Sequence, residues 1–300
     1  MSIRPVKRIV QSTPTMEGAG VRLRRAFGFG ETGDYDPFLL LADFRNDVTG
    51  DYLAGFPWHP HRGIETITYV LAGEVDHVDS LGNKGALRSG DVQWMTAGSG
   101  IMHQEMPHGD QQGRMHGFQL WANLPSSLKM TTPRYQDVPS SAVPEVTDDD
   151  GTRVRIVCGE FWGKRGPVDG TAAYPRYLDV FVPPGRRKTL PVEMGRQGFA
   201  YVFEGAGSFR DASAPQAVKT EATDGSDRVT IEQTGNRSLV IFDRGDEITV
   251  QAGDEGIRFL LVSGKPIEEP VAWHGPIVMN TPEEIRQAMS DLRNGTFIRD

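Results

Sequence analysis

Cysteine is almost absent from this sequence of 300 residues, because Cys158 is the single one. One cysteine excludes an internal disulfide framework, and a free cysteine usually packs as a small apolar residue, so we expect Cys158 to be buried. Long apolar runs are lacking too, since no segment approaches the roughly 20 apolar residues of a membrane span. The basic stretch Met1–Arg8 also lacks the apolar core of a signal peptide. We therefore expect a cytoplasmic protein that does not enter a membrane.

Positive charge is in short supply as well. The chain carries 32 Lys and Arg against 40 Asp and Glu, which gives a formal net charge of −8. Affinity for nucleic-acid phosphates or for anionic membrane surfaces depends on clustered Lys and Arg. The acidic balance therefore argues against direct binding to nucleic acid or to a membrane surface, and it leaves binding to a protein partner open.

Glycine and proline, by contrast, are abundant, with 35 and 20 residues. This composition fits many short strands joined by tight turns. Apolar and β-branched runs predict strands at Val21–Phe27, Pro37–Phe44 and Thr66–Leu71. The run Gly198–Gly207 repeats the strand-then-glycine form of Thr68–Gly73, which indicates a weak internal repeat. We infer an all-β chain with two related domains.

Two segments depart from the all-β pattern. Ala212–Ser226 is rich in Ala, Ser, Thr and acidic residues, and we predict a mobile hairpin extension there. Near the C-terminus, Thr281 is typical of a helix N-cap, with Pro282 at the first helical position and Glu284 at N3. Apolar residues follow at helical spacing, and Gly295 is a typical C-terminal stop. One apolar face on this predicted helix must pack against another element, most simply the outside of a sheet.

The chemistry of the chain is concentrated in two short motifs. His59 and His61 stand two residues apart, and so do His103 and Glu105. In a β-strand, residues i and i+2 point to the same face, so each pair can direct two ligands into one interior. Three imidazoles and one carboxylate form an open site for a divalent metal, because imidazole suits iron, copper, nickel and zinc. The pairs are distant in sequence, so only a closed or sandwiched sheet brings them together.

Other titratable residues offer alternatives to this ligand set. Exposed imidazoles on a turn are the alternative for the first pair, but the combination of both motifs favours the metal site. Glu65 shares the phase of His61, so it is either a carboxylate that supports the ligands or an alternative ligand; we favour Glu105. His116 is expected in the core or beside a ligand, because metal-bound imidazoles need an orienting hydrogen bond. The isolated histidines are predicted to be structural or exposed: His77, His108 and His274.

The residues around these motifs resemble a known family. The runs His59–Thr66 and Gly90–Pro107 resemble the two signature blocks of the pirin family. Two later runs, Gln119–Pro125 and Gly275–Ile285, are also similar to that family, so the resemblance spans both halves of the chain. It implies a bicupin, with two jelly-roll β-sandwich or barrel domains and a C-terminal helix packed on the outside.

The resemblance also implies where the metal binds. We expect an N-terminal metal-binding cupin at residues 1–135 and a C-terminal cupin at residues 136–300 that binds no metal and ends in the helix. One ion, most often Fe(II) in this family, would be held by His59, His61, His103 and Glu105. Ligand type alone leaves Mn, Ni, Cu and Zn open. In the second half Pro191 and Glu193 match the positions of the first histidine pair, and this is not a ligand set.

A function follows from the same resemblance. Several pirins resemble quercetin 2,3-dioxygenases, oxidoreductases that open flavonols such as quercetin with O2 and release carbon monoxide. The substrate would then be a small aromatic, flavonol-like molecule in the apolar barrel interior, and Glu105 would accept its hydroxyl proton. The alternative is a non-catalytic, iron-binding, redox-sensing regulator that binds a transcription factor or a metabolic enzyme. A cupin isomerase or storage-like protein with another metal is a third reading.

Overall fold

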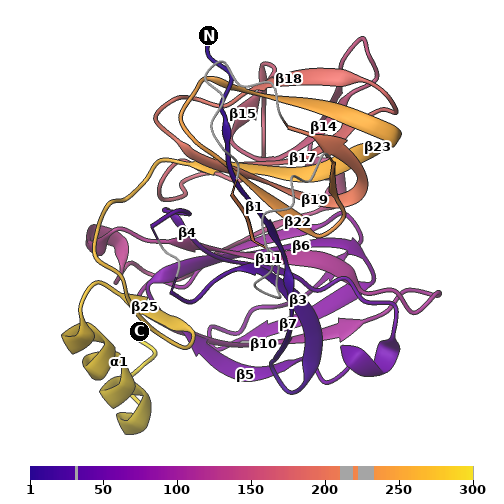
Figure 1. The fold of residues 1–300 in the computed structure, drawn as a ribbon. Helices are drawn as coiled ribbons and strands as arrows, with labels where there is room; N and C mark the ends of the chain where they lie inside the picture. The colour runs from indigo at the N-terminus through magenta and orange to yellow at the C-terminus, as the bar shows by residue number, and fades with distance from the viewer. Residues whose placement is uncertain (31–32, 210–218, 222–232, 300) are drawn as a thin grey trace. The chain divides into compact units, whose positions relative to one another are not determined.

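The computed structural model describes every residue except 31–32, 210–218, 222–232 and 300. The chain forms two compact units. Met1–Thr13 and Val143–Pro266 make the first, which we call the apolar unit. Pro14–Ala142 and Ile267–Asp300 make the second, which we call the histidine unit. Both consist mainly of antiparallel β-strands (Figure 1), which confirms the predicted all-β class.

Two sheets make up most of the histidine unit. The smaller has four strands, in the order β5 (Phe56–His61), β10 (Ile101–His108), β7 (Glu74–Asp79) and β8 (Lys84–Arg88). The larger has seven, in the order β12 (Arg134–Val138), β9 (Val92–Thr96), β6 (Ile64–Ala72), β11 (His116–Asn123), β4 (Phe38–Asp43), β3 (Val21–Phe27) and β2 (Thr13–Glu17). A ribbon and a helix complete the unit: β24 (Ala272–His274), β25 (Ile277–Met279) and α1 (Pro282–Asn294).

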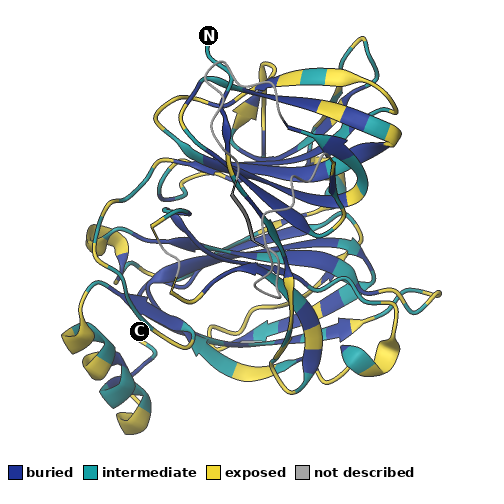
Figure 2. Cartoon of the chain, viewed as in Figure 1, coloured by how far each residue is buried: buried dark blue, intermediate teal, exposed yellow. Residues whose placement is uncertain are grey.

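These two sheets pack face to face. The ring of His61 on β5 lies 5.1 Å from that of Trp121 on β11, so side chains from the two sheets meet in the interior. Along β10 every second residue from Ile101 to Pro107 is buried, as expected for a strand with one face turned inward. Figure 2 shows this burial on the inner strands and exposed residues along the outer side of α1. The alternation decides which side chains enter the interior.

A ten-stranded sheet forms most of the apolar unit. Its path runs through β13 (Glu145–Thr147), β14 (Arg153–Cys158), β17 (Arg176–Val182), β23 (Glu247–Gly264), β19 (Gln197–Ser208), β22 (Ser238–Phe242), β1 (Val6–Gln11) and β20 (Lys219–Glu221). Off this path, β18 (Arg187–Pro191) pairs with β23, and β21 (Thr234–Gly235) with β19. A separate short hairpin consists of β15 (Glu160–Phe161) and β16 (Lys164–Arg165). The core is a cluster of buried aliphatic and aromatic residues, and Cys158 is buried as predicted.

Helix α1 begins and ends where the sequence predicts. The Thr281 hydroxyl accepts a hydrogen bond from the backbone N–H of Glu284, and the Glu284 carboxylate accepts one from the N–H of Thr281. This reciprocal pair is a capping box. Gly295 ends the helix in the left-handed conformation, with φ of 70°. The buried Ala288 packs in one apolar cluster with β25 and Phe297, and Figure 1 shows the helix beside that strand.

The division into units differs from the predicted boundary at both ends of the chain. Strand β1 belongs to the apolar unit because it pairs antiparallel with β22. Helix α1 belongs to the histidine unit because it packs on β25. The compact units thus differ from the predicted ranges 1–135 and 136–300 at the two terminal segments, each of which completes the unit built mainly from the other half of the chain. The contacts that tie these segments to the rest of their units join residues more than 200 positions apart, such as Val6 with Phe242 and Arg62 with Asp291, so sequence patterns do not indicate them.

Two further expectations concern the predicted hairpin extension and membrane-spanning segments. The predicted hairpin extension at Ala212–Ser226 lies outside the described residues, apart from the short strand β20. The helices among the described residues are too short or too polar to cross a lipid bilayer.

Candidate metal centre

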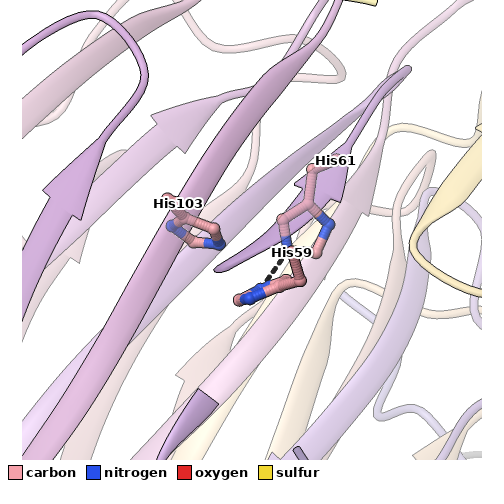
Figure 3. Close-up of side chains that lie close together, drawn as sticks. All are labelled: His59, His61 and His103. Atoms are coloured by element: carbon pink, nitrogen blue, oxygen red, sulfur yellow. Dashed lines mark hydrogen bonds between the residues drawn. The ribbon is translucent and has the colours of Figure 1, made fainter. Parts of the chain in front are cut away.

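Three of the predicted ligands meet between β5 and β10. The strands pair antiparallel with His103 directly opposite His59, while His61 is opposite Ile101. His61 and His103 are buried, and His59 is half-buried. Figure 3 shows the three rings turned toward one another from the two strands. The i, i+2 spacing of the first pair thus places both rings on the interior face, as the sequence predicts.

The ring nitrogens lie close enough to share one ion. One nitrogen from each of His59, His61 and His103 lies within 4.8 Å of the others. The ring centroids are 4.3 Å apart for His59 and His103, and 5.0 Å apart for His61 and His103. Among the described residues, these three form the group that could hold a metal ion.

Backbone carbonyls select the tautomers of the first pair. The Nδ1 atom of His59 is 2.9 Å from the Pro57 carbonyl oxygen, and Nδ1 of His61 is 3.2 Å from that of Pro276. A carbonyl oxygen only accepts, so each Nδ1 carries the proton and donates. Each Nε2 then holds a lone pair, which is the atom that a metal needs.

These two Nε2 atoms are 3.1 Å apart, and Figure 3 marks this contact with a dashed line. Burial lowers the pKa of His59 below its usual value and that of His61 well below it, so both rings are neutral near pH 7. With both protons on Nδ1, two lone pairs face each other. A bound cation would turn this repulsive contact into an attractive one, so the residues fit a metal.

His103 adds a third argument for a metal. Both of its ring nitrogens are buried and have no hydrogen-bond partner among the described residues. Burial, followed by the charges of neighbouring histidines, lowers its pKa well below the usual value, so this ring is neutral too. A buried polar atom without a partner costs about 1–3 kcal/mol, and a metal ligand bond removes that cost.

Glu105 is the fourth predicted ligand. It is buried on β10, two residues beyond His103, and the pairing of β10 with β5 shifts its register between these two residues. Burial raises the pKa of Glu105 to about 7, while a hydrogen bond from the Thr68 hydroxyl at 3.4 Å acts in the opposite direction. The Thr68 hydroxyl lies closer to Gln119, at 2.7 Å from its Oε1 atom. Metal binding by Glu105 stays a prediction.

Two other candidates have different partners. Glu65 is buried on β6, and its Oε1 atom accepts a hydrogen bond of 2.8 Å from the Thr96 hydroxyl. His116 is the first residue of β11 and is partly exposed, and its Nε2 atom lies 2.6 Å from a carboxylate oxygen of Asp47. The group that could hold an ion includes neither of them. The expectation that His116 supports a ligand is therefore not favoured by its contacts.

His77 is closer to the triad than its isolation in the sequence indicates. It lies directly opposite Glu105 in the pairing of β7 with β10, and its ring centroid is 5.4 Å from that of His103. The side chain is buried, neither ring nitrogen has a hydrogen-bond partner among the described residues, and Nε2 is 3.9 Å from Asp79. Its phase on the strand, two residues after the apolar Val75, is the signal that could have predicted an inward position.

Known proteins place these features in a family. The profile of the pirin family matches residues 20–122, and that of the pirin C-terminal cupin domain matches residues 177–298. A pirin-like protein of Caulobacter vibrioides is 43% identical over 298 residues, which cover 99% of this chain and 100% of that protein. The chain belongs to the pirin family. Membership confirms the resemblance read from the sequence and agrees with a bicupin of two β units.

Two more relatives carry names that refer to an activity. A Pseudomonas aeruginosa protein, named provisionally as a quercetin 2,3-dioxygenase, is 38% identical to this pirin-family chain, with 98% of each chain covered. The solved structure of a quercetin 2,3-dioxygenase from Acinetobacter baumannii has 31% identity and a TM-score of 0.83, and the match covers 98% of both chains. The fold similarity to that structure thus extends over both β units of this chain.

Proposed function

We propose that this protein is a metal-dependent quercetin 2,3-dioxygenase-like oxidoreductase. It would open a flavonol with O2 and release carbon monoxide. The observation that carries the proposal is the group of three buried or half-buried neutral imidazoles whose nitrogens lie within 4.8 Å of one another. The names of the P. aeruginosa relative and of the A. baumannii structure support the choice of reaction.

In this proposal His59, His61 and His103 hold one divalent ion, and Glu105 completes the ligand set. Fe(II) is our first choice, and Mn, Ni, Cu and Zn also suit this kind of site. When bound, the ion supplies Lewis acidity and, for iron, a redox-active centre. The carbonyls of Pro57 and Pro276 keep two of the rings in the tautomer that offers Nε2.

Glu105 is the proposed general base. Burial raises the pKa of this carboxyl to about 7 in the metal-free site, and a cation at the histidines would lower it again, so that Glu105 would be ionised and able to accept a proton. It would take the proton from the flavonol hydroxyl and hold it in a site that excludes bulk water. The Thr68 hydroxyl would keep the carboxylate oriented, since it lies 3.4 Å from the Oε1 atom.

Aromatic side chains around the triad suit a flat aromatic substrate. The ring of Trp121 meets that of His61 edge to face at 5.1 Å, and Trp273 lies 6.1 Å from Trp121. The ring of Phe56 is 6.5 Å from that of His59. Such rings offer large apolar faces that can stack on a flavonol.

The test is to load the protein with iron under anaerobic conditions, add quercetin and admit oxygen. Consumption of oxygen and release of carbon monoxide in matching amounts is the expected result. Glu105→Gln should lower kcat about 10²- to 10⁴-fold, as expected for the loss of a general base. Glu74→Gln, an exposed acid paired with Arg88, is the matched control and should keep full activity.

An iron-loaded protein that consumes no oxygen and releases no carbon monoxide would contradict the enzymatic proposal. The redox-sensing regulator would then be the function to test, through partner capture by the Fe(II) and Fe(III) forms.

A further inference from the structure

The C-terminal segment of the histidine unit reaches both turns that carry the candidate ligands. One turn follows His61 and begins with Arg62; the other contains Ser99 and Gly100 and leads into His103 on β10. The ribbon β24–β25, helix α1 and the residues that follow it belong to the same unit. They come from the last 34 positions of the chain, Ile267–Asp300, far from the ligands in sequence.

Arg62 joins these parts. Its side chain is 2% exposed, and its Nε atom donates a hydrogen bond of 2.6 Å to the Ser99 carbonyl. The two terminal nitrogens donate to the Asp291 carboxylate of α1 at 2.7 Å and to the Phe297 carbonyl at 2.9 Å. The guanidinium also lies 4.1 Å from the centroid of the Phe297 ring. The buried guanidinium of Arg62, the residue after His61, thus binds both the turn before His103 and the C-terminal segment.

The backbone around Arg62 is fixed to the same segment. The Arg62 carbonyl accepts a hydrogen bond of 3.1 Å from the N–H of Val278, and the Lys129 ammonium donates to the carbonyls of Gly63 and Val278 at 2.8 and 2.9 Å. Gly63 has φ of 78°, and a Cβ atom there would lie 2.0 Å from the Val278 carbonyl oxygen. The turn after His61 therefore has little freedom to move.

The second turn is held in the same way. A Cβ atom on Gly100 would lie 2.7 Å from the Phe297 carbonyl oxygen, so the backbone of the tail approaches this glycine closely. The two turns are also bonded to each other, since the N–H of Gly63 donates to the Gly98 carbonyl at 2.9 Å. Both turns and the tail form one connected buried network.

We infer that the C-terminal segment is part of the metal centre, with Arg62 and Asp291 as positioning residues for His61 and His103. The Pro276 carbonyl, which sets the tautomer of His61, comes from the same segment, 3.2 Å from Nδ1. Partners that orient metal-bound histidines typically change metal affinity about 10- to 100-fold when they are lost. The inference rests on the proposed metal site, but its test separates the two.

The test measures how fast nickel passes from the loaded protein to excess EDTA. Asp291→Asn removes the charge that faces Arg62, and Arg62→Lys keeps the charge but loses the planar fork that reaches three acceptors at once. We expect each variant to release nickel about 10- to 100-fold faster than the unsubstituted protein. Glu283→Gln, which breaks an exposed ion pair with Arg286 on the outer side of α1, should change the rate less than about threefold.

A second readout excludes general loosening of the fold. Near-UV circular dichroism at the temperature of the nickel assay should match for all variants, while the absorption spectrum of the cobalt-loaded protein should change in Asp291→Asn and Arg62→Lys alone. Phe297→Leu keeps the backbone carbonyl and removes the ring below Arg62, so it offers a milder variant if Asp291→Asn does not fold. It should shift nickel release in the same direction by a smaller factor.

The nickel assay distinguishes a wrong metal site from a wrong positioning role. If the unsubstituted protein retains no nickel, or retains it equally after His103→Ala, the proposed metal site is wrong. If His103→Ala loses nickel while Asp291→Asn, Arg62→Lys and Phe297→Leu release it at the unsubstituted rate, the positioning role is wrong and the metal site stands.

Discussion

The two β units use similar strand pairings to enclose different interiors. In the histidine unit β5 pairs with β10, and in the apolar unit β18 pairs with the first part of β23. The inward side chains of β10 include His103 and Glu105, whereas Val250 and Ala252 are buried on β23 within a hydrophobic cluster. Glu193, which the sequence matched to a ligand position, is exposed and instead pairs with Arg176. The same type of scaffold therefore encloses either a candidate site or a hydrophobic core.

This difference has an energetic consequence. Apolar side chains such as Val250 gain stability from burial alone, at about 25 cal/mol per Å² of apolar surface removed from water. The rings of His77 and His103 are also buried, but their nitrogens have no hydrogen-bond partner among the described residues. The interior of the histidine unit is thus expected to be less stable than that of the apolar unit until a ligand occupies it.

Replacing His103 with alanine should give the largest effect on metal binding. The variant loses one of three imidazoles, so we expect it to lose nickel binding and with it the stabilisation that nickel provides. At a nickel concentration 100 times Kd, that stabilisation is about 2.7 kcal/mol. Thermal unfolding with and without nickel measures it. His108→Ala, an exposed histidine of the same strand paired with Asp76, is the control and should keep the full shift; an equal shift in His103→Ala would refute the triad.

A core substitution in the apolar unit should lower stability and leave metal binding unchanged. Ile248→Ala on β23 creates a cavity in the fully buried core and should cost about 2–5 kcal/mol of unfolding free energy. Nickel affinity should stay unchanged, because the residue lies in the other unit. Urea unfolding and nickel titration check both results. Glu255→Ala, exposed on the same strand, should stay within about 0.5 kcal/mol of the unsubstituted protein.

Local sequence patterns were sufficient for much of this architecture. The i, i+2 spacing of His59 and His61 predicts a shared face, and the Thr281 and Glu284 pair predicts the start of α1, because both depend on the geometry of a few neighbouring residues. The candidate triad followed once two strands were assumed to face one interior. The isolated His77 had no motif around it, so only its phase on the strand could have indicated its place.

Long-range pairing was the part that the sequence could not provide. Arg62 binds Asp291 across 229 positions, and its role is invisible without the fold because an arginine beside a glycine is typical of an exposed turn. The exchange of terminal segments between units has the same cause. Strand β1 has ordinary strand composition, and nothing in it specifies that β22 rather than a nearer strand is its partner.

Glu105 gives the comparison a pH dependence, since the hydrophobic cluster of the apolar unit consists of side chains that do not titrate. Burial raises the pKa of Glu105 from 4.5 in its ordinary state to about 7, so the folded metal-free protein binds more protons than the unfolded chain between these values. The contribution of this carboxyl to stability should therefore fall as pH rises from about 4.5 to about 7, by an amount on the order of 3 kcal/mol. The neutral histidines of the triad, whose pKa values burial lowers, contribute in the opposite direction over the same interval.

Glu105→Gln should remove this contribution and keep that of the histidines, so its stability should rise more between pH 5 and pH 7 than that of the unsubstituted protein. Urea unfolding of the metal-free protein at the two pH values measures the difference, and Glu74→Gln serves as control. A Glu105→Gln variant whose stability changes with pH just as in the unsubstituted protein would show that the carboxyl is not held in the protonated form.

The smallest expected effect concerns His77. Its replacement tests whether the polar interior of the histidine unit becomes more stable when it is made as apolar as that of the apolar unit. His77→Phe replaces two nitrogens that have no hydrogen-bond partner among the described residues with an apolar ring of similar shape. The ring of His77 lies 4.9 Å from that of Tyr135, and a phenyl ring in its place could keep this aromatic contact. Since a buried polar atom without a partner costs about 1–3 kcal/mol, the metal-free variant should be more stable by about 1 kcal/mol. Thermal unfolding measures this gain; a loss of stability would mean that His77 has a polar partner, such as the carboxylate of Asp79 at 3.9 Å, that the substitution removes.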